Sequence, residues 1–191
     1  MAEFRHETER LVLRDWREED WTEFWRVTNT PSVMRWLGDE LDEAGMQAAW
    51  SRLQGYARDF GHTFWLLERK ADGGHLAGEV LGFCGLKRSN VVDQKVTGMV
   101  EIGWRLREEA WGRGYAKEAA IASLDLGFGH FQADEIIALT VEGNSASWGL
   151  MRRLGMVRRP DLDFWDDRLG EELAAHIVYA ITQQEWQEKH P

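Results

Sequence analysis

Two glycines stand two residues apart at 112 and 114, directly before an alanine-rich run. Neither residue has a Cβ, so each can take a positive φ and let the backbone come close to a ligand. Residues 115–130 carry apolar side chains at three- and four-residue steps, which predicts a helix. Free N–H groups and the helix dipole favour an anion at such a start. The spacing alone fits an anion-binding turn or a plain loop-to-helix transition equally well.

A carboxylate and a hydroxyl are predicted to lie on the elements that flank this turn. Residues 98–106 alternate like a strand, which places Glu101 on the face opposite the apolar side chains. Downstream, Asn144 is a good N-cap for a helix over 145–154. Ser147 lies three, four and seven residues before apolar positions of that helix and therefore on its buried stripe.

The glycine turn does not match the other common nucleotide or hydrolase motifs. The third glycine position of a dinucleotide-binding G-x-G-x-x-G motif is Lys117, and a single downstream carboxylate, Glu135, is weak support in so acidic a sequence. The sequence has no G-K-[ST] of a Walker loop, no G-x-S-x-G of a serine hydrolase and no paired Cys/His spacing for a metal. We therefore expect no metal centre.

The elements that must position these residues can be read from periodicity and turn signals. Strand-like runs cover residues 9–16, 63–70, 76–87, 98–106, 135–141 and 174–182. Helical patterns cover residues 18–28, 43–59, 115–130 and 145–154, and Gly155 would end the last of these. The sequence "ADGG" at 71–74 is a hairpin signal between the second and third strands. This order predicts one α/β sheet, mixed rather than wholly parallel.

Composition predicts one folded domain and excludes some partners. The chain has 191 residues, 43% hydrophobic, which is enough for a substantial core. A formal net charge of −10 argues against a nucleic-acid partner and is compatible with a cationic one, such as an amine or a basic peptide end.

The single cysteine and the N-terminal residues indicate the cellular compartment. The single cysteine, Cys84, lies in the apolar stretch "LGFCGL" and is interpreted as a packed thiol rather than a nucleophile. The first ten residues have no apolar core of a signal peptide, and no uncharged apolar run approaches the roughly 18 residues of a membrane span. We expect a cytoplasmic protein with no membrane partner.

The combination of segments resembles the GNAT N-acetyltransferase superfamily. The strand "VEIGWRL", the turn "WGRGYAKEA", the strand "IIALTVEGNSAS" and the helix end "LMRRLGM" occur in that family's order. Within it, the opening segments "TERLVLRDWREEDW" and "PSVMRWLG" resemble the RimJ/RimL type, the ribosomal-protein N-terminal acetyltransferases and their relatives. The resemblance implies a single domain over 1–191, with a mixed, mostly antiparallel twisted sheet and helices on both faces.

The resemblance implies that the anion is the pyrophosphate of acetyl-coenzyme A. The family's turn is usually Q/R-x-x-G-x-G/A; here Trp111 stands at the first position, while Gly114 and Ala116 fit, and the backbone donors remain. The pantetheine arm is expected to pair with the strand edge at 102–104. The coenzyme-binding residues implied in this way are Ile102, Gly103, Trp104, Gly112, Arg113, Gly114, Tyr115, Ala116, Lys117 and Asn144.

Acyl transfer to an amine needs a base for the ammonium proton and an acid for the departing thiolate. By resemblance Glu101 is assigned as general base, with an orienting or structural carboxylate as the alternative. Many family members use a tyrosine as the acid, and the stretch "GMVRRPDLDF" offers none, so Ser147 is the candidate and solvent the alternative. Cys84 is expected to lie away from the thiol site, which favours direct transfer in a ternary complex.

The acceptor is the least readable part of the sequence. By the usual placement of the family's elements, Trp36, Trp65 and Trp165 would line the acceptor pocket. The resemblance favours the α-amine of a protein or peptide, while polyamines, amino acids and antibiotics are acceptors within the same branch. A non-catalytic acyl-CoA-binding module on this fold stays open as the alternative function, and both monomer and homodimer stay open as oligomeric states.

Overall fold

Nine strands hydrogen-bond into one sheet within residues 3–190, which this computed structural model describes; residues 1–2 and 191 of the predicted domain lie outside that range. The strands are β1 (Arg5–Glu7), β2 (Leu11–Arg14), β3 (Phe64–Arg69), β4 (Val80–Arg88), β5 (Val100–Leu106), β6 (Glu135–Val141), β7 (Val157–Arg158), β8 (Phe164–Trp165) and β9 (Ala175–Thr182). Their order is β1-β2-β3-β4-β5-β6-β9-β7, with β8 also on β9. Every pair is antiparallel except β5 with β6, which confirms the predicted mixed, mostly antiparallel sheet.

Helices cover both faces of this sheet. They are α1 (Asp20–Thr28), α2 (Pro31–Met34), α3 (Glu43–Phe60), α4 (Tyr115–Gly129), α5 (Ser145–Arg153), α6 (Glu171–Ala174) and α7 (Gln183–Lys189). Successive residues of a strand point to opposite faces. On β4, Phe83 packs in the aromatic cluster of α1, whereas Cys84 packs in the main core with α4. The α1 side and the α4 side are therefore opposite faces of β4.

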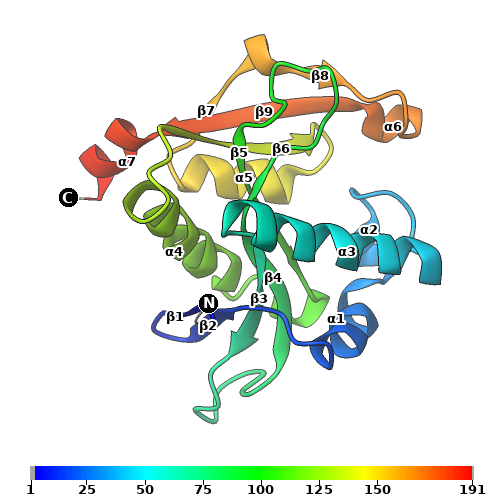
Figure 1. Ribbon diagram of the computed structural model, residues 1–191, viewed down its shortest axis with the longest axis vertical. Helices are drawn as coiled ribbons and strands as arrows, with labels where there is room; N and C mark the ends of the chain where they lie inside the picture. The colour runs from blue at the N-terminus through cyan, green and yellow to red at the C-terminus, as the bar shows by residue number, and fades with distance from the viewer. Residues whose placement is uncertain (1–2, 191) are drawn as a thin grey trace.

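Figure 1 shows how the chain divides around the parallel strands. Strands β1–β4 occupy the lower part of the view and β7–β9 the upper part, and β5 and β6 lie between them. Helix α4 connects β5 to β6, as a parallel pair requires a crossover rather than a tight turn. The site is built at the place where this crossover begins.

The longer predicted helices and strands are present, and their ends have physical causes. Asp42 caps α3 by accepting from the Gly45 N–H at 2.8 Å. The predicted helix over 115–130 is observed as α4, and the predicted strand over 135–141 as β6. The predicted cap at Gly155 is also present, since its N–H donates to the Arg152 carbonyl at 3.0 Å directly after α5.

The hairpin predicted at 71–74 is present, since β3 and β4 are an antiparallel pair, but its connection is not confined to those four residues. Residues 70–79 form a longer connection between β3 and β4 that is closed by its own hydrogen bonds, among them Asp72 Oδ1 accepting from the Gly74 N–H at 3.0 Å. The strand that follows therefore begins at Val80 rather than near 76. The short elements β1, β7, β8, α2 and α6 were not predicted, because two to four residues carry no readable periodicity.

Candidate active site

The parallel strands β5 and β6 pair only at their beginnings, where Val100 faces Ile136 and Glu101 faces Ile137. Beyond that point the strands separate. The Arg107 N–H donates to the Leu81 carbonyl at 2.8 Å on the β4 side, so alternation turns the N–H and C=O of Trp104 toward the gap. Among the described residues, nothing pairs with that stretch of the β5 edge, and an extended ligand can add to it as a strand does.

The turn before α4 presents a row of free N–H groups. Among the described residues, the N–H groups of 112–117 have no acceptor, and the first bond of α4 runs from the Glu118 N–H to the Gly114 carbonyl at 3.0 Å. Gly112 and Gly114 take φ of +68° and +79°, which side chains rarely adopt. A Cβ added at Gly112 would meet nothing within 4 Å, so the space above the turn is open. These are the features of an anion site at a helix N-terminus.

The turn is held by the N-terminal strands. Glu118 accepts from the Thr8 hydroxyl at 2.6 Å and from the Arg10 side chain at 2.7 Å. The side chain of Tyr115 is only 3% exposed, and its hydroxyl accepts from Arg69 Nε at 3.3 Å. Tyr115 can therefore offer a ligand its backbone N–H, while its ring fixes the start of α4.

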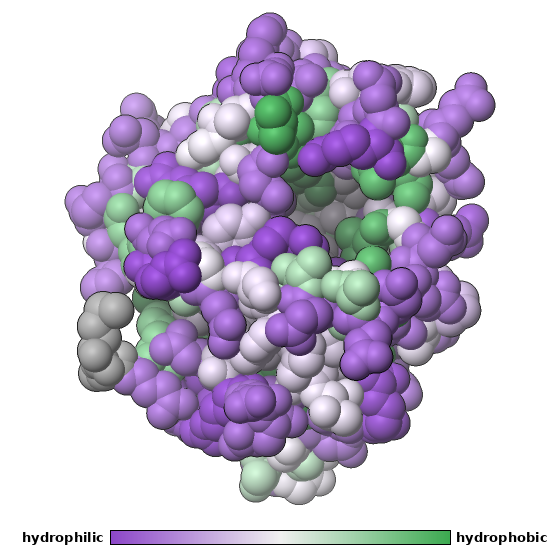
Figure 2. Space-filling view, turned by 45° about the vertical axis from the view of Figure 1, so that its right-hand side comes forward, coloured by the Kyte–Doolittle hydropathy of each residue, from purple (hydrophilic) through white to green (hydrophobic). Residues whose placement is uncertain are grey.

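A cavity of about 1080 Å³ joins this turn to the gap between β5 and β6. Its walls include the turn with Lys117 at one end and Glu101 at the other. Ser147 and Trp36 also line it. The space-filling view in Figure 2 shows a hollow with hydrophobic side chains around it on an otherwise mostly hydrophilic face. The dimensions are those of a small-molecule site.

Glu101 is a nearly buried carboxylate in this cavity, and its partner is Lys87. The two residues are directly opposite each other on β5 and β4. Lys87 Nζ lies 2.7 Å from Glu101 Oε2 as an ion pair, although without the angles of a directed hydrogen bond, and it donates to Asn90 Oδ1 at 3.0 Å. Lys87 thus holds one oxygen of the carboxylate in place.

Ser147 and Asn144 lie at the start of α5, as predicted. Asn144 caps the helix by accepting from the Ser147 N–H at 3.3 Å, and both residues line the cavity. Leu150, Met151 and Leu154, with which Ser147 shares its stripe, are buried. Within the described residues the Ser147 hydroxyl has no hydrogen-bond partner, so it is free to serve a ligand.

The three predicted acceptor tryptophans have different positions. Trp36 lines the cavity, and its ring lies against the backbone of Gly143, where an added Cβ would come within 2.7 Å of it. Trp65 was wrongly predicted to line it: this side chain is 1% exposed and stacks on Phe4 with centroids 4.4 Å apart. Trp165 is 52% exposed on β8 and does not line the cavity.

Two of the predicted coenzyme contacts also differ in detail. Gly103 lines the cavity, but the space above it is filled by the ring of Phe64, which would lie 2.7 Å from a Cβ there. Its missing side chain therefore admits an aromatic ring. The Arg113 side chain is exposed and does not line the cavity, and its carbonyl accepts from Arg10 Nη1 at 3.0 Å.

Four basic lining residues were not singled out from the sequence: Arg35, Lys87, Arg105 and Arg153. Arg105 shares the face of Glu101, and its guanidinium lies 5.2 Å from the ring centroid of Phe83. Burial lowers the pKa of Arg105 to about 10. The strand alternation that placed Glu101 on this face places Arg105 there too, so the signal was available in the sequence.

Cys84 is fully buried, 3.6 Å from the hydroxyl of Ser123, and burial raises the pKa of its thiol to about 12. A neutral, enclosed thiol is a poor nucleophile. In residues 3–190, no group of three or more His, Cys, Asp or Glu side chains could hold a metal ion. No helix within that range is long and apolar enough to cross a bilayer.

Comparisons with known proteins agree with this geometry. The chain is 32% identical over 160 residues to the uncharacterized protein YkkB of Bacillus subtilis, covering 83% of this chain and 88% of YkkB. It is 28% identical over 184 residues to the uncharacterized N-acetyltransferase YnaD of B. subtilis, covering 94% and 97%. The structure of spermidine N-acetyltransferase from Vibrio cholerae, in complex with CoA and spermine, shares the fold with a TM-score of 0.72 at 14% identity, covering 94% and 99% of the two chains. Residues 10–157 match the family described as "Acetyltransferase (GNAT) domain", and the chain is therefore a member of the GNAT acetyltransferase family, whose members use acetyl-CoA.

Proposed function

We propose that residues 1–191 act as one domain that transfers the acetyl group of acetyl-CoA to a primary amine, by direct attack in a ternary complex. The observation that carries this proposal is the continuity of one cavity. It runs from the free N–H groups of the turn, past the open edge of β5, to the carboxylate of Glu101. A bound thioester and a carboxylate that can accept a proton would thus share one space.

The coenzyme end is formed by backbone donors and two basic side chains. The N–H groups of 112–117 would bind the pyrophosphate, with Lys117 and Arg153 supplying positive charge from α4 and α5. The pantetheine amides would pair with the backbone of Trp104 and the adjoining edge at Ile102. When bound, acetyl-CoA supplies an acyl group activated as a thioester.

Glu101 and Ser147 have the two proton-transfer roles in this proposal. Glu101 takes the proton from the acceptor ammonium, directly or through water, and the freed amine nitrogen forms a bond to the acyl carbon. As the carbon–sulfur bond breaks, the Ser147 hydroxyl donates its proton to the thiolate and regains one from solvent. The burial of Cys84 supports direct attack, since an acetyl-enzyme on that thiol would need access that the fold denies.

The acceptor in this proposal is an α-amine, as at the N-terminus of a protein or peptide. The RimJ/RimL-type opening segments support this choice, and so does chemistry, since an α-amine has a pKa near 8 and a lysine near 10.4. A lower pKa demands less of a single carboxylate. Acetylation of a small molecule that carries an α-amine belongs to the same reaction class.

The test is a thiol-release assay with acetyl-CoA and a panel of N-terminal peptides, amino acids, polyamines and aminoglycosides, with products identified by mass. Ser147→Ala should lower kcat by roughly 10²-fold or more if the hydroxyl is the acid. Ser145→Ala is the matched control, because Ser145 begins the same helix but is exposed and does not line the cavity. Equal rates for the two variants would assign the proton to solvent, and silence across the panel would refute the proposed reaction.

A further inference from the structure

Arg105 is a half-buried cation with no counterion among the described residues. Its Nε and Nη1 atoms are shut off from solvent and have no hydrogen-bond partner among the described residues. The guanidinium is instead surrounded by aromatic rings, 5.2 Å from Phe83, 5.6 Å from Trp25 and 5.7 Å from Phe24. The charged group that acts on Arg105 is another cation, Arg52, and its repulsion further disfavours the protonated guanidinium.

Such an arrangement is costly to the fold by itself. Burying a cation carries a desolvation penalty that cation–π contacts only partly offset. Buried arginines are ordinarily paired with a carboxylate. All sixteen salt bridges in residues 3–190 involve other basic groups. The missing anion is therefore to be sought in the cavity that Arg105 lines.

The cavity is basic although the chain is acidic. Its lining includes five Lys and Arg side chains against a single carboxylate, Glu101, while the whole chain has a net charge of −10. Lys117 and Arg153 lie at the coenzyme end. Arg35, Lys87 and Arg105 remain for the acceptor end, and Lys87 is paired with Glu101. An acceptor that carries only positive charge would meet an excess of positive charge there.

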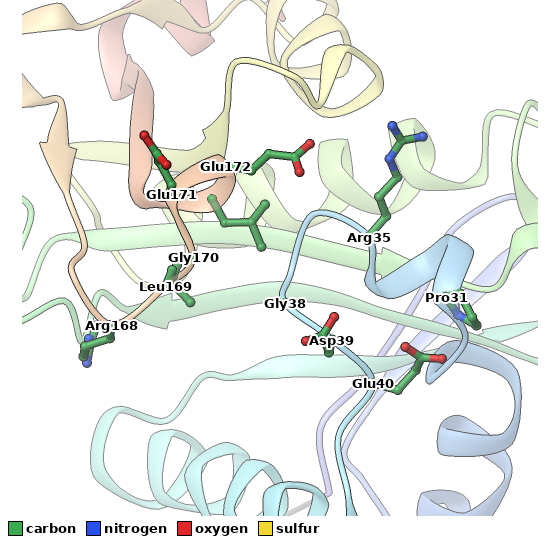
Figure 3. A pocket seen from close by; sticks show the side chains of 11 residues that line it. Pro31, Arg35, Gly38, Asp39, Glu40, Arg168, Leu169, Gly170, Glu171 and Glu172 are labelled. Carbon is green, nitrogen blue, oxygen red and sulfur yellow. The ribbon is translucent and has the colours of Figure 1, made fainter.

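The acidic side chains gather elsewhere. A second depression lies between the loop after α2 and the segment at α6, and Figure 3 shows the residues that line it. Arg35 borders both spaces, and the acidic residues of the second are Asp39, Glu40, Glu171 and Glu172. The negative charge of the molecule is thus segregated from the lining of the catalytic cavity.

Resting on the proposed acetyl transfer, we propose that Arg105 binds a carboxylate of the acceptor, so that the acceptor is an amine that also carries a carboxylate. A planar guanidinium binds a carboxylate through two parallel hydrogen bonds. Arg105 lies two residues from Gly103 and four from Glu101 on one strand face, about 7 Å and about 13 Å along β5 at ~3.3 Å per residue.

Two sources share this chemistry, a free amino acid and a peptide with a carboxylate near its N-terminus. The experiment compares matched pairs that have the same amine: amino acids with their carboxamides, and short N-terminal peptides with Glu or Gln at the second position. We expect kcat/KM to be about tenfold or more higher for the carboxylate of each productive pair, since a hydrogen bond to a charged group contributes roughly 1.5–3 kcal/mol. Preference in the first set identifies the amino acid, and preference in the second identifies the peptide.

Variants assign the preference to Arg105. Arg105→Met, of similar length without charge, should abolish the preference for the carboxylate member of each pair, while the calorimetric Kd for CoA stays within about twofold of wild type. Arg105→Lys keeps the positive charge but lacks the paired N–H donors of the guanidinium. It should therefore retain only part of the preference for the carboxylate. Arg58→Gln is the control for net charge, because Arg58 is 75% exposed on α3 and pairs with Asp59.

Equal turnover within every pair, a preference for polyamines, or an equal loss for both members in Arg105→Met would each overturn the inference. If no amine is acetylated, the proposed reaction fails, and binding still decides the role of Arg105. Trp25 lies beside the guanidinium, so tryptophan fluorescence of the CoA complex can follow titration with the same pairs. Carboxylate binding that is lost in Arg105→Met supports the carboxylate site, whereas equal or absent binding of both members refutes it.

Discussion

The ion pair between Lys87 and Glu101 makes a simple substitution of the proposed base ambiguous, and this ambiguity can be resolved. The two side chains are only 12% and 11% exposed, with 2.7 Å between Nζ and Oε2. Glu101→Gln removes the carboxylate that is proposed to accept the substrate proton, and it also leaves a nearly buried ammonium without its anion. A fall in rate would then reflect lost chemistry, a disturbed fold, or both.

The structural part of the effect can be bounded. Removing one partner of a buried ion pair costs roughly 3–5 kcal/mol. Lys87 keeps its hydrogen bond to Asn90 Oδ1, which favours the lower end, about 3 kcal/mol. In a chain of this size each kcal/mol lowers Tm by about 2–4 °C, so Glu101→Gln should lower Tm by about 6–12 °C.

The double variant Glu101→Gln/Lys87→Met separates the two effects. Replacing a buried pair with uncharged side chains of similar volume is often neutral or stabilising, so Tm should return to within a few degrees of wild type. The rate should not return: kcat should stay roughly 10²–10⁴-fold below wild type in both variants if Glu101 is the general base. That deficit should shrink at higher pH, where more of the acceptor amine is already neutral.

Differential scanning calorimetry and the thiol-release assay, run on the same three variants including Lys87→Met, give the complete cycle. Recovery of kcat in the double variant would show that Glu101 serves only as the counterion of Lys87, and the assigned base would be wrong. An unchanged Tm in Glu101→Gln would refute the reasoning about burial, because the ammonium would then have another source of compensation.

Three further predictions concern the turn, a buried histidine and the thiol. Gly114→Val should abolish CoA binding, measured by calorimetry, and lower the free energy of unfolding by about 1–2 kcal/mol, since φ is +79° there. An unchanged Kd for CoA in the folded variant would remove the phosphate assignment. Gly129→Val at the far end of α4 is the control for stability. Burial lowers the pKa of His62, whose Nδ1 lies 3.0 Å from the Leu86 carbonyl, so this side chain favours the neutral form when folded. Wild-type stability should therefore be fully present above pH ~6.5 and decline as the pH falls through the lowered pKa of the folded state, a slope that His62→Gln should flatten in urea titrations at pH 5–7.5. Cys84 should resist iodoacetamide until the chain unfolds, and Cys84→Ala should retain full turnover; loss of turnover in a folded Cys84→Ala protein would contradict direct transfer.

The parts of this fold that were predictable are those in which local chemistry and tertiary structure agree. The glycines at 112 and 114 predicted a turn of positive φ before a helix with apolar side chains at three- and four-residue steps. The structure has both the turn and the helix. Strand alternation placed Glu101, and helical periodicity placed Ser147, in the right elements, and both line the cavity. Spacing alone left the role of the turn open, and the family resemblance supplied the proposal that it binds an anion.

What escaped prediction depends on which strands become neighbours. Trp36 and Trp65 are alike as residues, but Trp65 is covered by Phe4 from the N-terminal segment, a contact 61 residues away in the chain. Lys87 acquires its importance only from the register that places it opposite Glu101. The space above Gly103 is filled by Phe64 from β3, although the glycine had suggested a close ligand. These strand registers and tertiary contacts cannot be read from a single sequence.

The contrast between overall charge and cavity charge shows why net charge was a poor guide to the acceptor. The acidic loop residues near β7 and β8 are neutralised locally, with Asp161 paired to Arg159 at 2.9 Å and Asp166 to Arg168 at 2.7 Å. Such exposed pairs are screened within roughly 8–10 Å at physiological salt, so they bear little on a ligand inside the cavity. The guanidinium of Arg105, with Nε and Nη1 buried, is screened less than such surface charges, and its preference acts on a group that reaches it. In the proposed carboxylate site, one unpaired Arg105 would therefore outweigh a surplus of surface carboxylates in selecting the acceptor.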